Sequence, residues 1–360
     1  MDSLSWLKHA LANIPRFVRG QQGSTPGFYR YSFSGDLYDE NEFWGLTSSV
    51  FAAKILYMLA VLDDRHTHDL ITRIKQFESA DGTLFDPLLL KKSFFPSLLT
   101  SLKQRDFHGL VHHTQMLKRA ETRQSTAALL CLGSGPSRPY RDIPETSESI
   151  RAFLSSLSWH LPWNAGSHLS HLLFFLHHNQ QLFGLYDTGQ SLTDEVVAFL
   201  ATIQSPTDGA WYTGTPVSTT QKINGAMKVL TGLSAAGIHQ VPFVEKLIDT
   251  CLSHKTEEGA CCSIDALYVL HWCSRASSHR EADVHQYALH KIEEIKEYYH
   301  ETQGGFSFYH HRANARIYGA KVTSGKDEPD LHGTVLYVWG LVMIAQILRL
   351  TDVPHRQPIT

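Results

Sequence analysis

The feature that most constrains this fold is a set of segments that are apolar on every side when wound as α-helices. They begin near Trp44, Ser167, Cys262 and Leu331, and the first and last read WGLTSSVFAAKILYMLAVL and LHGTVLYVWGLVMIAQIL. Apolar residues recur at the i, i+3, i+4 and i+7 spacing of a helix, and alternating runs of strand length are nearly absent. Because a helix that is apolar all round must be buried, the sequence predicts an all-α protein with a layer of inner helices.

A second class of segment carries charge on one face and alternates with the first, as in SIRAFLSSL and PFVEKLIDTCL. Three loops between the two classes repeat an order of Gln, Gly and then an aromatic or apolar residue: QFESADGTLFDP, IQSPTDGAWYTGTP and TQGGFSFYHH. Repeated helix pairs of this size stack as helical hairpins. With inner helices expected to start near residues 44, 122, 165, 221, 262 and 331, we predict six inner helices ringed by outer ones, an α/α toroid.

This toroid is expected as a single domain over residues 41–350, with a lead-in at 1–40 and a tail at 351–360. The lead-in places Leu4, Leu7, Leu11, Ile14 and Phe17 at helical spacing, which predicts a helix packed on the domain or, as the alternative, peripheral contact with a membrane surface. No stretch approaches the roughly 18 apolar residues of a transmembrane helix.

The composition limits the kinds of partner and the cellular compartment that we expect for this protein. A formal net charge of −3 and the lack of any Lys/Arg-rich run argue against nucleic acid as a partner. The five cysteines are odd in number and form no CxxC motif, and the first residues lack the pattern of a secretory signal, so we expect a reducing, cytoplasmic location. The composition indicates no particular oligomeric state.

Polar residues gather at the expected starts of the inner helices. In a toroid these amino ends meet at one mouth of the central cavity, where free N–H groups favour polar or anionic ligands. A few convergent polar groups in an otherwise apolar cavity are typical of a small-molecule site. The candidate catalytic residues are Asp330, His332, His168 and Asp265. The candidate substrate-binding residues are Arg123, Trp163, Asn164, His171, Lys222, Asn224, Trp211, Tyr212 and Tyr318.

Two pairs of these residues have a structural alternative. Asp330 and His332 could form a hydrogen-bonded acid–base pair, or Asp330 could be a helix N-cap beside an exposed histidine. His168 and His171 are three residues apart and share a helix face, so the two side chains could be ligands of a zinc ion, although no third ligand of suitable spacing is evident. We therefore expect no cofactor. The loop ARIYGAKVTSGKDEPD, from residue 315, is either a lid over the site or a surface connection.

The repeated loops and the alternation of helix types resemble the superfamily of terpenoid cyclases and protein prenyltransferases, over residues 44–350. EPDLHGTVL is similar to the cyclase motif Pro-Asp-x-Asp-Asp-Thr at an inner-helix start: Asp330 and Thr334 match it, whereas His332 stands at the position of the proton donor and Gly333 at the next. The resemblance implies a toroid enzyme that cyclises or isomerises an isoprenoid-like chain by proton transfer. It also implies that Cys262, Asp265 and His332 could imitate the zinc site of the prenyltransferases.

Two other functions fit the same residues. Carbohydrate-active toroids, such as uronate lyases and epimerases, abstract a proton with His or Tyr while Arg and Asn neutralise the carboxylate, for which Arg123, Asn224, His168 and Tyr318 are suited. A non-catalytic scaffold that binds another molecule is the third alternative.

Overall fold

Helices make up most of the protein, and the few strands are two residues long, which confirms the all-α prediction at the level of fold class. The computed structural model describes residues 1–92, 107–186, 192–254, 260–353 and 356–360, without the side chains of 107–113 and 260–263. Two compact units divide the chain. Unit 1 comprises Met1–Ser137, Ile292–Val342 and Asp352–Ile359, and unit 2 comprises Arg138–Lys291, Met343–Thr351 and Thr360.

The lead-in and most of the tail belong to unit 1, and one edge between the units falls between Thr351 and Asp352. A single toroid domain over residues 41–350 stays a prediction. None of the helices in the described residues is long and apolar enough to cross a membrane.

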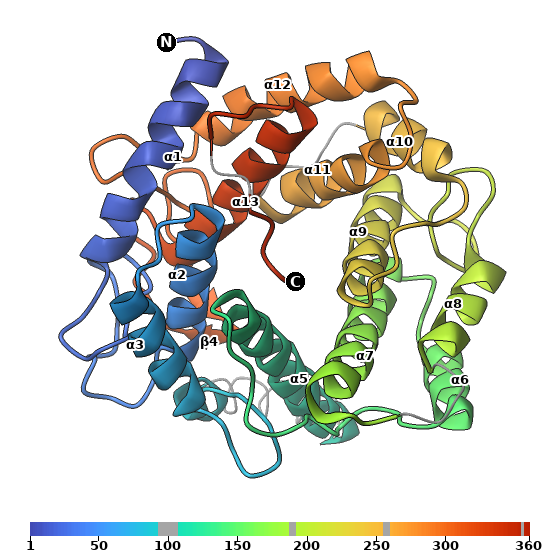
Figure 1. The fold of residues 1–360 in the computed structure, drawn as a ribbon, viewed down its shortest axis with the longest axis horizontal. Coiled ribbons are helices and arrows are strands. Elements are labelled where there is room, and N and C mark those ends of the chain that lie inside the picture. The colour runs from blue at the N-terminus through green and yellow to red at the C-terminus, as the bar shows by residue number, and fades with distance from the viewer. Residues whose placement is uncertain (93–106, 187–191, 255–259, 354–355) are drawn as a thin grey trace. The chain divides into compact units, whose positions relative to one another are not determined.

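Unit 1 shows the expected contrast between inner and outer helices. Helix α2 (Leu46–Met58) is buried on all sides, whereas α3 (Asp64–Lys75), which lies beside it in Figure 1, buries only Leu70, Arg73 and Ile74. The other elements of unit 1 are α1 (Ser3–Gly20), α5 (Phe107–Cys131), β1 (Tyr299–His300), β2 (Gly305–Phe306), β3 (Arg316–Ile317), β4 (Ala320–Lys321) and α13 (Leu331–Ile347), which runs on into unit 2.

The amphipathic helix α1 packs within unit 1 through its apolar face. The ring of Trp6 meets the edge of Tyr299 at 5.6 Å and lies 6.5 Å from Phe306, and Phe17 covers Gly305. Seven residues of this face are at most 3% exposed, and Leu4 at its start is partly exposed. A face used in this way is not available to a membrane surface, so the packed alternative is the one found.

The three repeated loops share one backbone conformation, a left-handed glycine followed by an antiparallel bridge. Gly82, Gly209 and Gly304 all have a positive φ of 75–80°, and the residue two positions later forms an antiparallel bridge: Leu84 with Glu78, Trp211 with Gln204, and Phe306 with Tyr299. A positive φ is open to glycine because it lacks a Cβ. The sequence repeat is therefore confirmed as a repeat of local structure.

In unit 1 the repeat extends to the inner helices that follow. Thr122 on α5 hydrogen-bonds the N–H and C=O of Leu84 at 3.1 and 3.3 Å, and Thr334 on α13 does the same with Phe306 at 3.0 and 3.2 Å. Beside each threonine a carboxylate accepts the N–H two residues further along the loop. The Glu121 carboxylate accepts the N–H of Asp86 at 2.9 Å, and the Asp330 carboxylate accepts the N–H of Phe308 at 2.9 Å. We call these two contacts the carboxylate pins.

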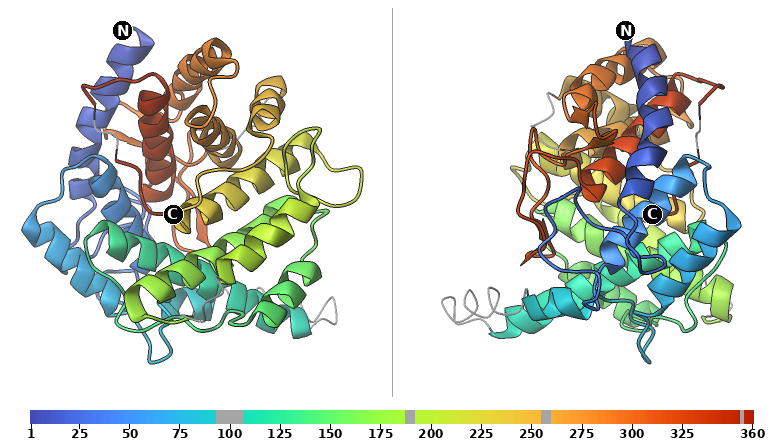
Figure 2. Two further views of the ribbon diagram at one scale, coloured as in Figure 1. Left: turned by 45° about the vertical axis from the view of Figure 1, so that its right-hand side comes forward. Right: turned by 90° about the vertical axis from the view of Figure 1, so that its left-hand side faces the viewer.

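Unit 2 is built around two helices in close contact, α7 (Pro162–Phe183) and α9 (Thr219–Ala235), which run alongside each other in Figure 2. A Cβ on Gly166 would lie 2.9 Å from the carbonyl oxygen of Gly225, and one on Gly232 would lie 2.8 Å from the Cα of Ser170. Glycine at both positions lets the backbones touch. The remaining helices are α6 (Ser147–Ser156), α8 (Leu192–Ile203), α10 (Val244–Ser253), α11 (Ala260–Ser274) and α12 (Glu281–Lys296), whose last residues enter unit 1.

Most predicted helix positions agree with the structure, but the expected start near Thr122 is wrong. Helix α5 begins at Phe107, so Glu121 and Arg123 lie inside the helix and not at its amino end. The segment before Thr122 lacks the dense apolar pattern of an inner helix, yet Leu, Met, Lys, Arg and Ala are good helix formers and extend it.

The loop before α13 is held to the rest of unit 1 by its backbone. The N–H of Leu37 donates to the carbonyl of Val322 at 2.9 Å, and the N–H of Ser324 donates to that of Gly35 at 2.8 Å. The side chain of Glu328 accepts both the N–H and the hydroxyl of Ser34. The loop is thus a paired part of unit 1, and its predicted role as a lid stays a prediction.

We predict that Gly333→Ala destabilises the protein by about 3 kcal/mol, at the upper end of overpacking costs. A Cβ there would lie 2.5 Å from the carbonyl carbon of Ser307 and closer still to the nitrogen of Phe308, and backbone atoms cannot move aside cheaply. Chemical denaturation measures the change. Gly20→Ala is the control, because a Cβ at Gly20 meets nothing within 4 Å and should change stability little. Equal effects of the two substitutions would contradict the packing described here.

Candidate functional site

The structure divides the predicted site residues between the two units. Asp330, His332, Arg123 and Tyr318 belong to unit 1. The others belong to unit 2: His168, Asp265, Trp163, Asn164, His171, Lys222, Asn224, Trp211 and Tyr212. We describe each group within its own unit.

Asp330 is the N-cap of α13 and a pin of the loop before it. One carboxylate oxygen accepts the N–H of Gly333 at 2.8 Å, and the other accepts those of Phe308 at 2.9 Å and Asn314 at 3.0 Å. Burial raises the pKa of Asp330 to about 7, although these N–H donors act in the opposite direction. The backbone N–H of His332 is a further donor to this carboxylate, whereas the expected hydrogen bond to the His332 ring is not formed among the described residues.

The imidazole of His332 pairs with Asn314 instead. The Asn314 amide nitrogen lies 3.0 Å from His332 Nδ1 and donates to the Tyr31 hydroxyl at 3.1 Å, while its carbonyl oxygen accepts the N–H of Arg316 at 3.2 Å. This orientation makes Nδ1 an acceptor, and burial lowers the pKa of His332 to about 4. We infer a neutral ring with its proton on Nε2.

Aromatic rings enclose this imidazole. Phe51 of α2 stacks on it at 4.9 Å between centroids, and Phe308 lies on it at 4.6 Å. His332 nevertheless remains partly exposed, while its neighbours Leu331 and Thr334 are fully buried. Nε2 has no hydrogen-bond partner among the described residues, so it can donate its proton to a bound molecule.

One face of α2 connects His332 to polar groups of α5. Thr47, Phe51 and Lys54 follow the i, i+4, i+7 spacing of a helix face. The Thr47 hydroxyl pairs with the Glu121 carboxyl, and the Lys54 ammonium donates to Gln124 Oε1 at 2.5 Å. Burial lowers the pKa of Lys54 to about 8.

Glu121 is the group in this region best placed to hold a proton at neutral pH. Burial raises its pKa to about 8, helped by the nearby Asp86 carboxyl, whose own pKa burial raises to about 6. Asp86 accepts the N–H groups of Gly45 at 2.8 Å and Leu46 at 3.3 Å, which start α2. Those donors favour a charged Asp86, so Glu121 is the member of the pair that stays protonated.

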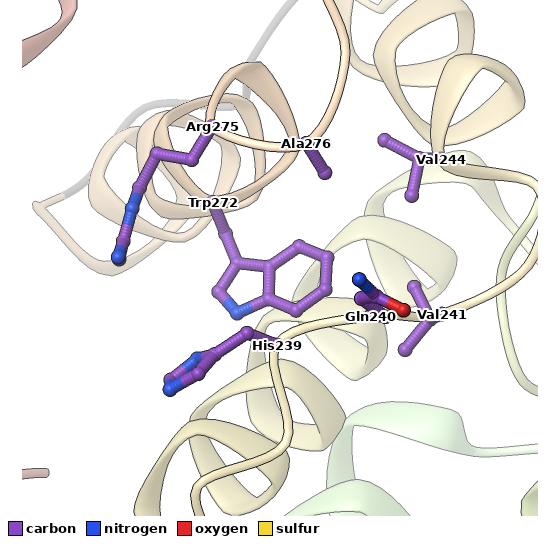
Figure 3. A pocket seen from close by; sticks show the side chains of 7 residues that line it. All are labelled: His239, Gln240, Val241, Val244, Trp272, Arg275 and Ala276. Atoms are coloured by element: carbon purple, nitrogen blue, oxygen red, sulfur yellow. The ribbon is translucent and has the colours of Figure 1, made fainter.

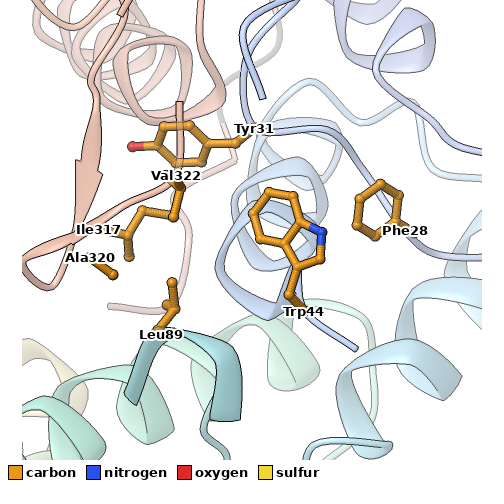
Figure 4. Packing of buried hydrophobic residues seen from close by; sticks show 7 residues of the cluster. All are labelled: Phe28, Tyr31, Trp44, Leu89, Ile317, Ala320 and Val322. Atoms are coloured by element: carbon orange, nitrogen blue, oxygen red, sulfur yellow. The ribbon is translucent and has the colours of Figure 1, made fainter. Parts of the chain in front are cut away.

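Tyr318 lies close enough to Glu121 for that carboxyl to help burial raise the pKa of the Tyr318 phenol. It occupies the β3–β4 turn with a positive φ of 48°, a strained conformation for a non-glycine residue. Its ring and that of Phe51 pack against a buried cluster (Figure 4) made of Phe28, Tyr31, Trp44, Leu89, Ile317, Ala320 and Val322. The cluster joins the β3–β4 hairpin, through Ile317 and Ala320, to Trp44 just before α2. We call His332, Asn314, Phe51, Phe308, Glu121 and Tyr318 the unit 1 site.

In unit 2, three predicted residues meet at one junction. The Lys222 ammonium of α9 donates to Asp208 at 2.8 Å, the Tyr212 hydroxyl donates to the same oxygen at 2.9 Å, and Lys222 lies over the Tyr212 ring. Trp211, next to Tyr212, is buried and pairs with Gln204. These contacts fasten the loop to α9.

The other predicted residues of unit 2 differ in burial. His168, Asn224 and Asp265 are buried, His171 is partly buried, and Trp163 and Asn164 are exposed. Burial raises the pKa of Asp265 to about 6, opposed by Lys228. Within the described residues, no three or more His, Cys, Asp or Glu side chains gather to hold a metal ion, and the side chain of Cys262 lies outside them.

Sequence reasoning overlooked part of the unit 1 site. Tyr31 and Asn314 lie in irregular segments, where periodicity carries no signal. Lys54 does have a readable signal, since it is a charged residue in the middle of a helix that is otherwise apolar. Arg123 is buried in α5, and its charge contributes to the lowered pKa of Lys54.

Comparison with known proteins gives no assignment: no family model, curated protein or solved structure matches the chain.

Glu121→Gln should make the protein more stable at high pH than at low pH, relative to wild type. Below the unfolded pKa of about 4.5 Glu121 is protonated in both the folded and the unfolded state. Between about 4.5 and about 8 the unfolded state releases this proton while the folded state keeps it, so the wild type loses stability as the pH rises, and the loss is complete above about 8. Glutamine copies the protonated acid and removes this loss, which amounts to about 4 kcal/mol between pH 5 and pH 9. Denaturation of both proteins at pH 5 and pH 9 measures the difference; a constant difference would contradict a protonated Glu121.

We also predict that His332 stays neutral at pH 6, with Nε2 protonated. The ring nitrogens have distinct ¹⁵N chemical shifts in each tautomer, so NMR of ¹⁵N-histidine-labelled protein reports the state directly, with His332→Gln to assign the signal. In Asn314→Leu, Nδ1 loses its donor and the tautomer preference should relax. An imidazolium signal at pH 6 would refute the arrangement inferred here.

Proposed function

We propose that the unit 1 site belongs to an enzyme that binds a small, mainly apolar molecule and isomerises or cyclises it by proton transfer. The observation that carries this proposal is the His332 imidazole, held neutral by Asn314 and flanked by Phe51 and Phe308. A donor N–H between two aromatic faces suits a ligand that is apolar except for one oxygen.

The proposed roles follow from the protonation states. His332 donates a hydrogen bond from Nε2 to the substrate oxygen and orients the molecule; it is not the base, because that nitrogen already carries its proton. Glu121 is the proposed acid, since it retains a proton near neutral pH. Its proton would pass to a substrate carbon, with Tyr318 beside it as a relay, and the carboxylate would recover a proton from a neighbouring carbon. Aromatic faces stabilise the cation formed between these steps.

The likeness of EPDLHGTVL to the terpenoid cyclase motif supports the same reaction class. In our proposal the acid is Glu121 and not the aspartate of the motif, Asp330. Asp330 is occupied by backbone N–H groups, so we assign it a positioning role. An α/α toroid of six inner helices remains our proposal for the complete architecture. The uronate-lyase alternative assigns its chemistry to Arg123, Asn224, His168 and Tyr318, of which Arg123 and Tyr318 belong to unit 1 and the other two to unit 2. It stays an alternative.

Deuterium incorporation tests the proposal. Purified protein is incubated in D₂O with geranylgeraniol or squalene, and the recovered compounds are analysed by mass spectrometry. A proton-initiated isomerisation places deuterium on carbon, and Glu121→Gln should lower the rate by at least about 100-fold, the usual contribution of a general acid. His332→Gln should raise KM as well as lower kcat. His9→Gln, on the exposed face of α1, is the control.

Two results would contradict the proposal. Exchange that is unchanged in Glu121→Gln would remove its assigned acid. Release of unsaturated products from oligogalacturonate, with no deuterium entering either isoprenoid, would establish the lyase alternative instead.

A further inference from the structure

Unit 2 contains a pocket of about 570 Å³ that is separate from all the residues discussed above (Figure 3). It is lined by the loop between α9 and α10, the start of α10 and the end of α11. Its residues are His239, Gln240, Val241, Val244, Trp272, Arg275 and Ala276. A volume of this size lies within the range of about 300–1,000 Å³ that is usual for small-molecule sites.

The apolar part of the pocket is rigid. Trp272 is 4% exposed, and its indole Nε1–H donates to the Ser234 hydroxyl at 2.9 Å, which fixes the ring and satisfies its polar edge. Tyr268 donates to the same hydroxyl. With Val241, Val244 and Ala276 beside it, the indole forms a surface suited to the face of a flat apolar group (Figure 3).

The polar part of the pocket has unused hydrogen-bonding capacity. Arg275, His239 and Gln240 are exposed, and none of the three makes a side-chain hydrogen bond or ion pair with a described residue. The acidic residues nearby are engaged elsewhere: Glu245 accepts from Ser277 at 3.2 Å, and Asp249 binds His279 at 2.9 Å and Arg280 at 3.3 Å. The charge of Arg275 is therefore not compensated by those acids.

We propose that this pocket binds a small planar carboxylate, with its ring on Trp272 and its carboxylate on the Arg275 guanidinium. A guanidinium presents donors in a fork that matches a carboxylate, and His239 and Gln240 offer further donors at the rim.

The probe for the test is 2-naphthoate, compared with its uncharged isostere 2-naphthamide. Isothermal titration of the full chain should give one site per chain and at least tenfold tighter binding of the carboxylate. Arg275→Gln should weaken 2-naphthoate at least tenfold and leave 2-naphthamide within twofold. Arg65→Gln, which removes an exposed arginine of unit 1, is the charge control and should change neither.

A second variant tests the place of binding without altering charge. Ala276→Trp should fill the pocket and abolish binding of both compounds, while the thermal midpoint stays close to that of wild type. The proposal is overturned if both compounds bind equally, if Arg275→Gln has no more effect than Arg65→Gln, or if a folded Ala276→Trp protein still binds 2-naphthoate normally.

Discussion

The carboxylate pins are the contacts on which unit 1 depends. Helix α13 is apolar all round and has no polar face to orient it, so its position along and about its axis must come from specific contacts. Asp330 supplies one at its amino end by accepting loop N–H groups, and Glu121 makes the equivalent contact from within α5. Thr334 and Thr122 complete the two contacts. Buried backbone N–H groups need partners, so the same bonds satisfy the loops.

These pins also determine where chemistry is available. A carboxylate surrounded by backbone donors is fixed in place, which suits Asp330 to hold the loop that carries Phe308 and Asn314. Glu121 makes fewer such bonds and lies beside Asp86, so burial keeps its proton near neutral pH. The two pins thus differ in how many backbone donors surround them, and in our proposal Asp330 positions the loop while Glu121 is the acid.

Unit 2 relies on a different constraint. Gly166 and Gly232 allow α7 and α9 to approach until their backbones touch, and Lys222 and Tyr212 fasten the adjoining loop through Asp208. Lys222 and Tyr212, which the sequence suggests as substrate-binding residues, therefore have structural contacts here. The unpaired polar groups of unit 2 that line a pocket lie elsewhere, around Trp272.

The helical class, the inner and outer helices and the repeated loops can be read from the amino-acid sequence, because apolar periodicity and left-handed glycines such as Gly82 and Gly209 act locally. The sequence also indicates Asp330 as a helix start and His332 as a residue of interest. In contrast, the pairing of the His332 ring with Asn314 instead of Asp330, and the position of Glu121 within a helix beside Asp86, depend on contacts between distant segments. Protonation states follow from burial and from partners distant in the chain, and neither can be read from local spacing.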